Sequence, residues 1–175
     1  DAFVKEKGMG ETAAAFKSDI EGSLRQQEEE MNARRRESGL FENLTKATTV
    51  DLAPELIEME ARALAEDLGA QLQRSKLTLE NWLAQQKKTA EDLKKDLEGE
   101  AKRRLTLRFG LEKALEMKGI TVTDDDMKQI VEEAKSQMTQ EERLEHAADY
   151  APGGEAYDRL KWQKTVEKFV KTMLE

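Results

Sequence analysis

The chain has 175 residues, with 37 acidic and 29 basic side chains and a net charge of −8. The absence of Cys excludes a disulfide framework, a thiolate metal site and a thiol nucleophile, and the single His, His146, leaves few routes to catalysis. The acidic excess argues against direct nucleic-acid binding as the main activity, because phosphate contacts require clustered basic side chains.

The chain also lacks the features of a membrane or secreted protein. No apolar run approaches the roughly 18 residues that cross a bilayer, and no signal-peptide pattern opens the sequence. We therefore expect a soluble protein with no membrane partner. Because the chain begins with Asp1 rather than Met, we expect an excised domain.

The composition predicts an all-α fold. Ala and Leu supply 20 residues each, Val and Ile supply 10 together, and Gly and Pro total 12, which favours helix over sheet. Leu, Ile, Val and Phe together supply only 35 residues, so a thick spherical core is not expected.

The first predicted helix is long and covers residues 12–47. Phe16, Ile20 and Leu24 give it an apolar stripe at spacings of four. Residues 25–38 are polar all round, which is typical of a solvent-exposed strut between two packed ends. The basic run at 34–36 lies beside acidic residues, so we expect a salt-bridged face there and at the similar run 102–104.

The next helices begin and end at recognisable capping residues. Pro54 suits the first turn of a helix that ends near Ser75. A short helix follows Thr78, and a long one follows Thr89, which has Asp92 three residues on. Gly119 is placed to end that long helix.

Three further helices complete the predicted order. Thr123 followed by three Asp is a strong helix start, because anions complement the helix dipole. Thr139 with Glu142 forms the pattern of a capping box. After a Pro-Gly-Gly loop, the last helix is expected from about Glu155.

Candidate chemistry is sparse. The consecutive acids at 124–126 lack the alternating ligands and central Gly of a calcium loop. Glu142 and His146 lie one turn apart, but a carboxylate-bridged di-iron site needs two Glu-x-x-His sets. No dinucleotide or phosphate-binding loop is present, so we expect no metal, no cofactor and no catalytic residue.

The remaining signal is a set of Met and aromatic residues spread over thin helices. Such side chains suit adaptable binding surfaces, although ordinary helix packing is the better explanation for any single one of them.

Three segments resemble the C-terminal domain of bacterial trigger factor. Residues 99–127 read GEAKRRLTLRFGLEKALEMKGITVTDDDM, like the segment that joins the two arms of that domain. Residues 50–57, VDLAPELI, followed by Glu60, resemble the linker into an arm helix, and residues 3–8 with Leu24 resemble its entry from the preceding domain.

The resemblance implies a cytoplasmic, ATP-independent chaperone domain that is elongated and all-α, with a long first helix and two helical arms around an open crevice. It implies a linker helix and body at 1–53, arm 1 at 54–104, body at 105–123, arm 2 at 124–151 and a C-terminal helix at 152–175. The family's prolyl isomerase domain is absent from these residues, so no isomerase activity is expected. Ribosome contact would run only through a domain also absent here.

The expected partners are unfolded or nascent polypeptides, with weak self-association besides. We expect clients to contact apolar side chains on both arms, namely Trp82, Leu83, Leu93, Met127, Ile130, Met138, Leu144 and Tyr150. Two alternatives stay open at this point. They are a periplasmic-type helical chaperone and a helical adaptor with one specific protein partner.

Overall fold

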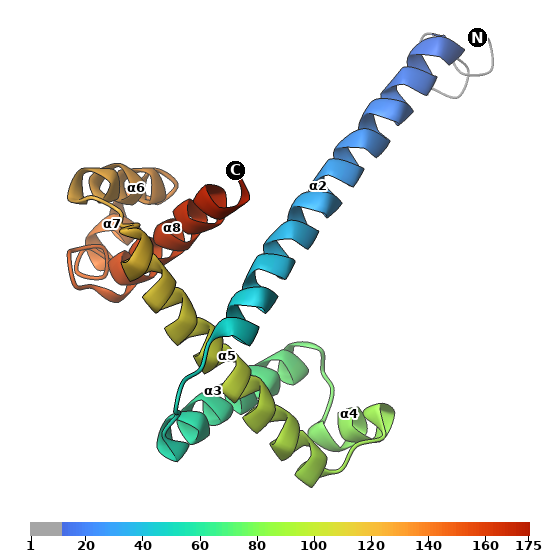
Figure 1. Cartoon of the computed structure of the whole chain (residues 1–175), viewed down its shortest axis with the longest axis vertical. Helices are drawn as coiled ribbons and strands as arrows, with labels where there is room; N and C mark the ends of the chain where they lie inside the picture. Colours follow the sequence, from blue (N-terminus) through green and yellow to red (C-terminus); the bar gives the residue numbers. More distant parts are fainter. Residues whose placement is uncertain (1–11) are drawn as a thin grey trace. The chain divides into compact units, whose positions relative to one another are not determined.

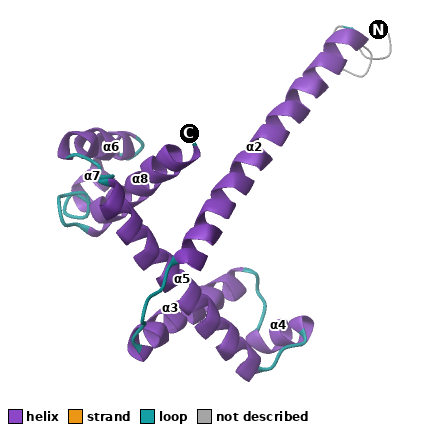
Figure 2. Ribbon diagram, viewed as in Figure 1, coloured by secondary structure: helices purple, strands orange, loops and turns teal. Residues whose placement is uncertain are grey.

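The computed structural model describes residues 12–175, and within that range every regular element is a helix (Figures 1 and 2). The predicted all-α class and long first helix are therefore confirmed. Residues 3–8, on which part of the resemblance rests, lie outside the described residues. The helices are α2 (Ala13–Ala47), α3 (Pro54–Arg74), α4 (Leu79–Gln86), α5 (Ala90–Lys118), α6 (Asp124–Ser136), α7 (Gln140–Glu145) and α8 (Glu155–Leu174).

The helix boundaries follow the capping residues that the sequence analysis identified. Thr89, Thr123 and Thr139 each accept a hydrogen bond from the backbone N–H three residues on, and the acid at that position accepts one in return. Each capping box satisfies two otherwise unpaired backbone donors. At the other end of α5, Gly119 adopts the left-handed conformation (φ 64°) that terminates helices.

The chain divides into two compact units near residue 41, and each is described by itself. The first is the greater part of α2, drawn in Figure 1 as one unbroken helix. Every residue from 21 to 38 is exposed, as the polar middle predicted. The apolar stripe before it is not packed away, because the side chains of Ile20 and Leu24 remain 42% and 59% exposed.

The second unit contains α3 to α8, and one part of its packing lies between α3 and α5. Leu64 and Leu72 of α3 are buried, and so are Ala101 and Leu105 of α5. Arg104 on α5 reaches Glu60 on α3 at 3.6 Å and Glu100 on its own helix at 3.3 Å.

A second apolar cluster is built around α6. Val122, Met127 and Val131 form its buried centre. Four half-buried side chains pack against that centre, namely Ile130, Tyr150, Tyr157 and Leu160. Lys168 of α8 donates a hydrogen bond to the carbonyl of Thr121 across 47 residues of sequence (2.9 Å). These contacts join α8 to the segment that precedes α6.

The linker between α2 and α3 approaches α5 closely. A Cβ atom on Gly110 would overlap with the hydroxyl of Thr48, and that hydroxyl donates a hydrogen bond to the carbonyl of Leu44 (2.7 Å). Gly110 is buried. Only a residue without a side chain fits α5 at this position.

The salt-bridged faces expected at the two basic runs differ. At 102–104 the prediction is confirmed, because Arg103 and Arg104 both contact Glu100. At 34–36 a solvated face is confirmed but its ion pairs are not, since within residues 12–175 none of the three arginines has an acid at ion-pair distance. All three arginine side chains are exposed.

Candidate functional site

An apolar groove lies between α3 and α5, and α4 contributes Leu79 to it. Its volume is about 370 Å³. Small side chains of α3 and larger ones of α5 line its apolar surface, namely Ala61, Ala65, Leu93 and Leu97, together with Ala90 at the start of α5. Charged side chains stand at its edges, namely Glu58, Arg62, Lys94 and Glu98. We call this surface the α3–α5 groove.

The groove arises from helical periodicity. Ala61 and Ala65 are one turn apart on α3, and Leu93 and Leu97 are one turn apart on α5, so each pair occupies one face of its helix. The two alanines are too short to fill the space between the helices, which leaves an apolar hollow open to solvent. Such a surface accepts apolar side chains of another chain without a specific polar contact.

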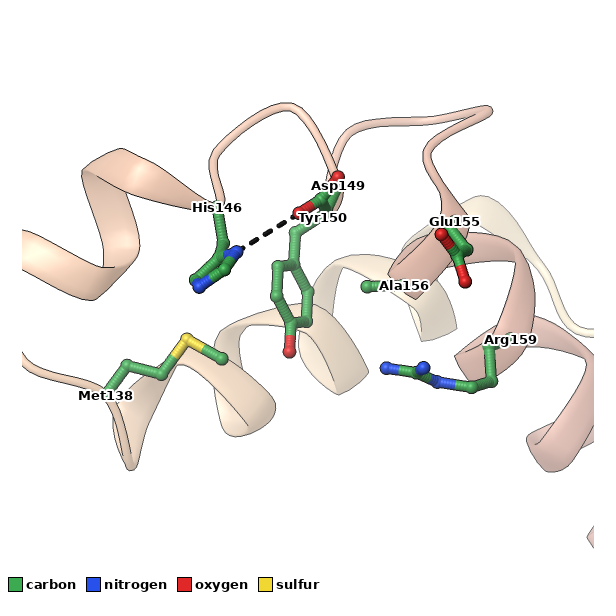
Figure 3. A pocket seen from close by; sticks show the side chains of 7 residues that line it. All are labelled: Met138, His146, Asp149, Tyr150, Glu155, Ala156 and Arg159. Atoms are coloured by element: carbon green, nitrogen blue, oxygen red, sulfur yellow. Dashed lines mark hydrogen bonds and ion pairs between the residues drawn. The ribbon is translucent and has the colours of Figure 1, made fainter. Parts of the chain in front are cut away.

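A smaller pocket of about 280 Å³ lies where the segment after α7 meets α8 (Figure 3). Met138 and Tyr150 supply its apolar atoms, and Figure 3 shows the Met138 thioether directed toward the Tyr150 ring. Ala156 also lines the pocket. The other four lining residues are polar, namely His146, Asp149, Glu155 and Arg159. We call it the α7–α8 pocket.

Two polar residues that line the α7–α8 pocket contact each other. His146 Nδ1 lies 3.1 Å from a carboxylate oxygen of Asp149, as the dashed line in Figure 3 marks. Both side chains are about half exposed, 48% and 53%.

A third hollow, of about 350 Å³, is lined by residues of α6 and α8 and has Val122 and Ile130 as its apolar residues. Lys164 and Asp126 lie at its border. The hydrogen bond that Lys164 donates to Glu167, together with the attraction between their charges, raises the pKa of Lys164 and lowers the pKa of Glu167. Hydrogen bonds from the Thr123 side chain and backbone lower the pKa of Asp126. The border thus stays charged at neutral pH.

The eight residues predicted from the sequence do not form one site. Met138 and Tyr150 share the α7–α8 pocket, Leu93 lines the α3–α5 groove, and Ile130 lines the third hollow. Trp82 and Leu83 are half-buried on α4. Leu144 is 74% exposed on α7, and Met127 is fully buried.

Met127 therefore has no surface to offer a partner in this structure. Its side chain fills the centre of the α6 cluster at 0% exposure. Sequence reasoning in turn missed the floor of the α3–α5 groove. The sequence does contain a pair of alanines on α3 and a pair of leucines on α5. That pattern is typical of ordinary helix packing, and only the space between the two helices shows that it lines a groove.

In residues 12–175 no group of three His, Asp or Glu side chains lies close enough to hold a metal ion, and no charged side chain is buried. None of the helices in that range combines the length and apolar character that a bilayer crossing requires. The fold and its hollows define an all-helical domain with several shallow, partly apolar surfaces.

The chain belongs to the family described as bacterial trigger factor protein (TF) C-terminus, which matches residues 12–175. The trigger factor of Carboxydothermus hydrogenoformans is 28% identical over 127 residues, covering 73% of this chain and 30% of that protein. The trigger factor of Parasynechococcus marenigrum is 26% identical over 83% of this chain and 30% of its own length. Trigger factor 2 of Desulfitobacterium hafniense is 26% identical over 74% of this chain.

These matches delimit what the residues contain. The chain spans about 30% of the length of the trigger factors that it matches. Because the C-terminal family occupies residues 12–175, those residues hold the C-terminal domain and not the prolyl isomerase domain. No solved structure matches the chain at a significant level.

Proposed function

We propose that this chain is a chaperone domain that binds unfolded and nascent polypeptides in the cytoplasm without nucleotide. Family membership supports the chaperone role. The observation that carries the binding mode is the α3–α5 groove, an apolar hollow that is open to solvent and rimmed by charged side chains. Of the three possibilities that the sequence left open, the family match supports this one.

The apolar area that each hollow can bury determines how tightly it binds a client. Burial of about 100 Å² of apolar client surface in one hollow stabilises the complex by about 2.5 kcal/mol, which alone is weaker than millimolar binding. Two or more hollows that hold one flexible chain raise the affinity through effective concentration. A client segment then leaves each hollow quickly, while the whole client is retained by several hollows. Neither process needs an energy source.

Both predicted arms are assigned client contacts, and one of the predicted residues is not. Residues 54–104 carry the α3–α5 groove together with Trp82, Leu83 and Leu93, and residues 124–151 carry Met138, Leu144 and Tyr150. Ile130 contributes from the third hollow. Met127 is left out because it has no exposed surface. We assign no ribosome contact to this chain, since the resembled family docks through another domain.

The direct test is a titration of the chain with two unrelated, permanently unfolded polypeptides in the absence of nucleotide, followed by NMR. Micromolar binding of both, with shifts at Leu93 and Tyr150, is expected. Binding of neither would overturn the proposal. Binding of one folded protein and of no unfolded chain would replace it with a specific adaptor.

A matched pair of variants tests the groove. Leu79 is 47% exposed and lines the α3–α5 groove, whereas Leu56 is 39% exposed and lies outside its lining. Leu79→Ser should weaken client binding about threefold to tenfold, the effect of one lost leucine contact. Leu56→Ser should leave it unchanged. Equal affinities for the two variants would show that the groove does not bind clients.

A further inference from the structure

The short helix α4 is weakly held in the second unit. None of its eight residues is buried, whereas α3 and α5, on either side of it in the sequence, each contain buried residues. Its largest apolar side chains, Trp82 and Leu83, are half-buried. Among residues 12–175, no hydrogen bond or ion pair joins a side chain of α4 to α3 or α5. Two chain connections and a few apolar contacts therefore keep α4 in place.

Both chain connections of α4 contain a residue in an unfavourable backbone conformation. Figure 2 shows a loop at each end of the helix. Lys76 lies before α4 and Lys87 directly after it, and each has φ 53°. Among residues 12–175 these two lysines are the only residues other than Gly with a positive φ. The left-handed conformation costs free energy for any residue that has a Cβ atom, so both strained positions flank one helix.

Backbone hydrogen bonds hold the two lysines in this conformation. The N–H of Lys76 donates to the carbonyl of Gln73 (3.0 Å), and the N–H of Lys87 donates to the carbonyl of Ala84 (3.2 Å). Gly119 ends α5 with the same kind of turn at φ 64°, where the absence of a Cβ atom removes the cost. A rotation that returned either lysine to negative φ would break its hydrogen bond and release its strain.

One face of α4 is apolar and lies next to the α3–α5 groove. Leu79, Trp82 and Leu83 are three and four residues apart, which places them on the same side of the helix. Leu79 lines the groove, whereas the other two lie outside its lining. A turn of α4 toward the groove would bring Trp82 and Leu83 to a segment bound there.

We propose that α4 is a lid of the α3–α5 groove, which turns about Lys76 and Lys87 and closes over a client segment. The lid rests on the proposed function, because it needs a client in the groove to cover. In the closed position at least one of the two lysines has left the left-handed conformation, and the strain released offsets part of the contacts that α4 gives up. Trp82 and Leu83 then contact the client, as expected for them from the sequence.

An ion pair anchors the second pivot. Lys88 Nζ lies 2.5 Å from a carboxylate oxygen of Asp96 on α5. Because Lys88 directly follows Lys87, this pair ties the loop after α4 to α5. The pivot at Lys87 therefore stays beside α5 while α4 turns.

Glycine at both pivots tests the part played by strain. In the double variant Lys76→Gly with Lys87→Gly, the left-handed conformation no longer carries a cost, so the open lid gains over the closed one. The same change favours the observed fold, so a loss of binding would not come from unfolding. Dissociation of a permanently unfolded polypeptide, measured by stopped-flow fluorescence, should become about threefold to tenfold faster. An unchanged or slower dissociation would overturn the lid.

Two controls separate strain from charge and from flexibility. Lys76→Gln with Lys87→Gln removes the same two charges but keeps the Cβ atoms. Ser75→Gly loosens the same loop at a residue whose φ is −84° and which needs no glycine. Both should release the polypeptide at the rate of the unaltered chain. If either is as fast as the double glycine variant, charge or loop flexibility rather than a lid controls release.

The movement itself can be measured with spin labels, since the chain has no Cys of its own. One labelled pair is Asn81→Cys on α4 with Lys95→Cys on α5, and the reference pair is Ala70→Cys on α3 with the same Lys95→Cys. All three residues are exposed. When the unfolded polypeptide binds, double electron–electron resonance should show the first distance changed by about 5 Å, the radius of a helix, and the second unchanged.

Binding and movement are measured separately. If the unaltered chain binds no unfolded polypeptide, the proposed function and the lid are both overturned. If it binds the polypeptide and the distance from Asn81→Cys to Lys95→Cys does not change, the lid alone is overturned and the α3–α5 groove keeps its proposed role.

Discussion

Thr48 and Gly110 are in such close contact that the hydroxyl of Thr48 occupies the space a Cβ atom on Gly110 would need. The two residues are 62 positions apart in the sequence, and one belongs to the linker while the other lies inside α5. The contact holds the linker against α5 within the second unit. It also gives Gly110 a role that helix propensity alone would oppose, because Gly is unfavourable within helices.

Gly110→Ala is expected to destabilise the protein by about 1–3 kcal/mol, the usual cost of forcing atoms into a packed site. The control is Gly99→Ala on the same helix, where an added Cβ meets nothing within 4 Å. That change should stabilise by about 0.5–1 kcal/mol. Urea unfolding of both variants makes the comparison, and stabilisation by Gly110→Ala would refute the close contact.

Met127 is expected to behave as a core residue rather than a client contact. Met127→Ala should cost about 2–5 kcal/mol of folding free energy, the range for large-to-small core substitutions. Leu144→Ala, at a side chain that is 74% exposed, should change stability by no more than about 0.5 kcal/mol. Thermal unfolding of each variant measures the difference, and a Met127→Ala protein as stable as the unaltered one would contradict the structure.

Because of the capping boxes, the free energy of unfolding should depend on pH in the acid range. Hydrogen bonds from Thr123 lower the pKa of Asp126, and those from Thr139 and Thr89 lower the pKa values of Glu142 and Asp92. A carboxyl whose pKa is lower in the folded state contributes stability above its unfolded pKa, near 3.9 for Asp and about 4.3 for Glu. This contribution disappears as the pH falls through the folded value.

Asp126→Asn should therefore lose stability at pH 7, and the gap to the unaltered chain should close as the pH falls below about 4. Asp124→Asn is the control, because Asp124 shares the first turn of α6 but is not the partner of Thr123 in the capping box. Urea unfolding at a series of pH values compares the variants. A gap that stayed constant down to the acid limit would show that the carboxylate charge plays no part.

The ion pair between Arg104 on α5 and Glu60 on α3 should contribute little to the free energy of unfolding. Its side chains are 51% and 29% exposed, and pairs of this kind are worth about 0–1 kcal/mol. A double-mutant cycle with Arg104→Met and Glu60→Gln should give a coupling below about 1 kcal/mol that shrinks in salt. A larger coupling would mean that solvent screens the pair less than its exposure indicates.

Helix boundaries were predictable from the sequence because their determinants are local. Thr89, Thr123 and Thr139 each act within three residues, and Pro54 and Gly119 act through their own backbone geometry. The all-α class and the polar middle of α2 followed from composition and periodicity in the same way.

Packing between helices was not predictable to the same degree. Periodicity places Met127 on an apolar face of α6, but only the position of α8 and of the segment around Tyr150 buries that face. The role of Gly110 depends on a linker far away in the sequence, and the α3–α5 groove depends on the spacing of two helices. A local sequence pattern does not determine how far apart two such segments lie in the fold.

The capping boxes also bear on how the chain acquires its structure. α5, α6 and α7 each carry at their N-terminus the residues that start them, so each can begin to form as soon as its own segment is available. Folds dominated by such local contacts reach the native state in microseconds to milliseconds. A domain of this kind can be assembled piece by piece as it leaves a ribosome, without waiting for its last helix.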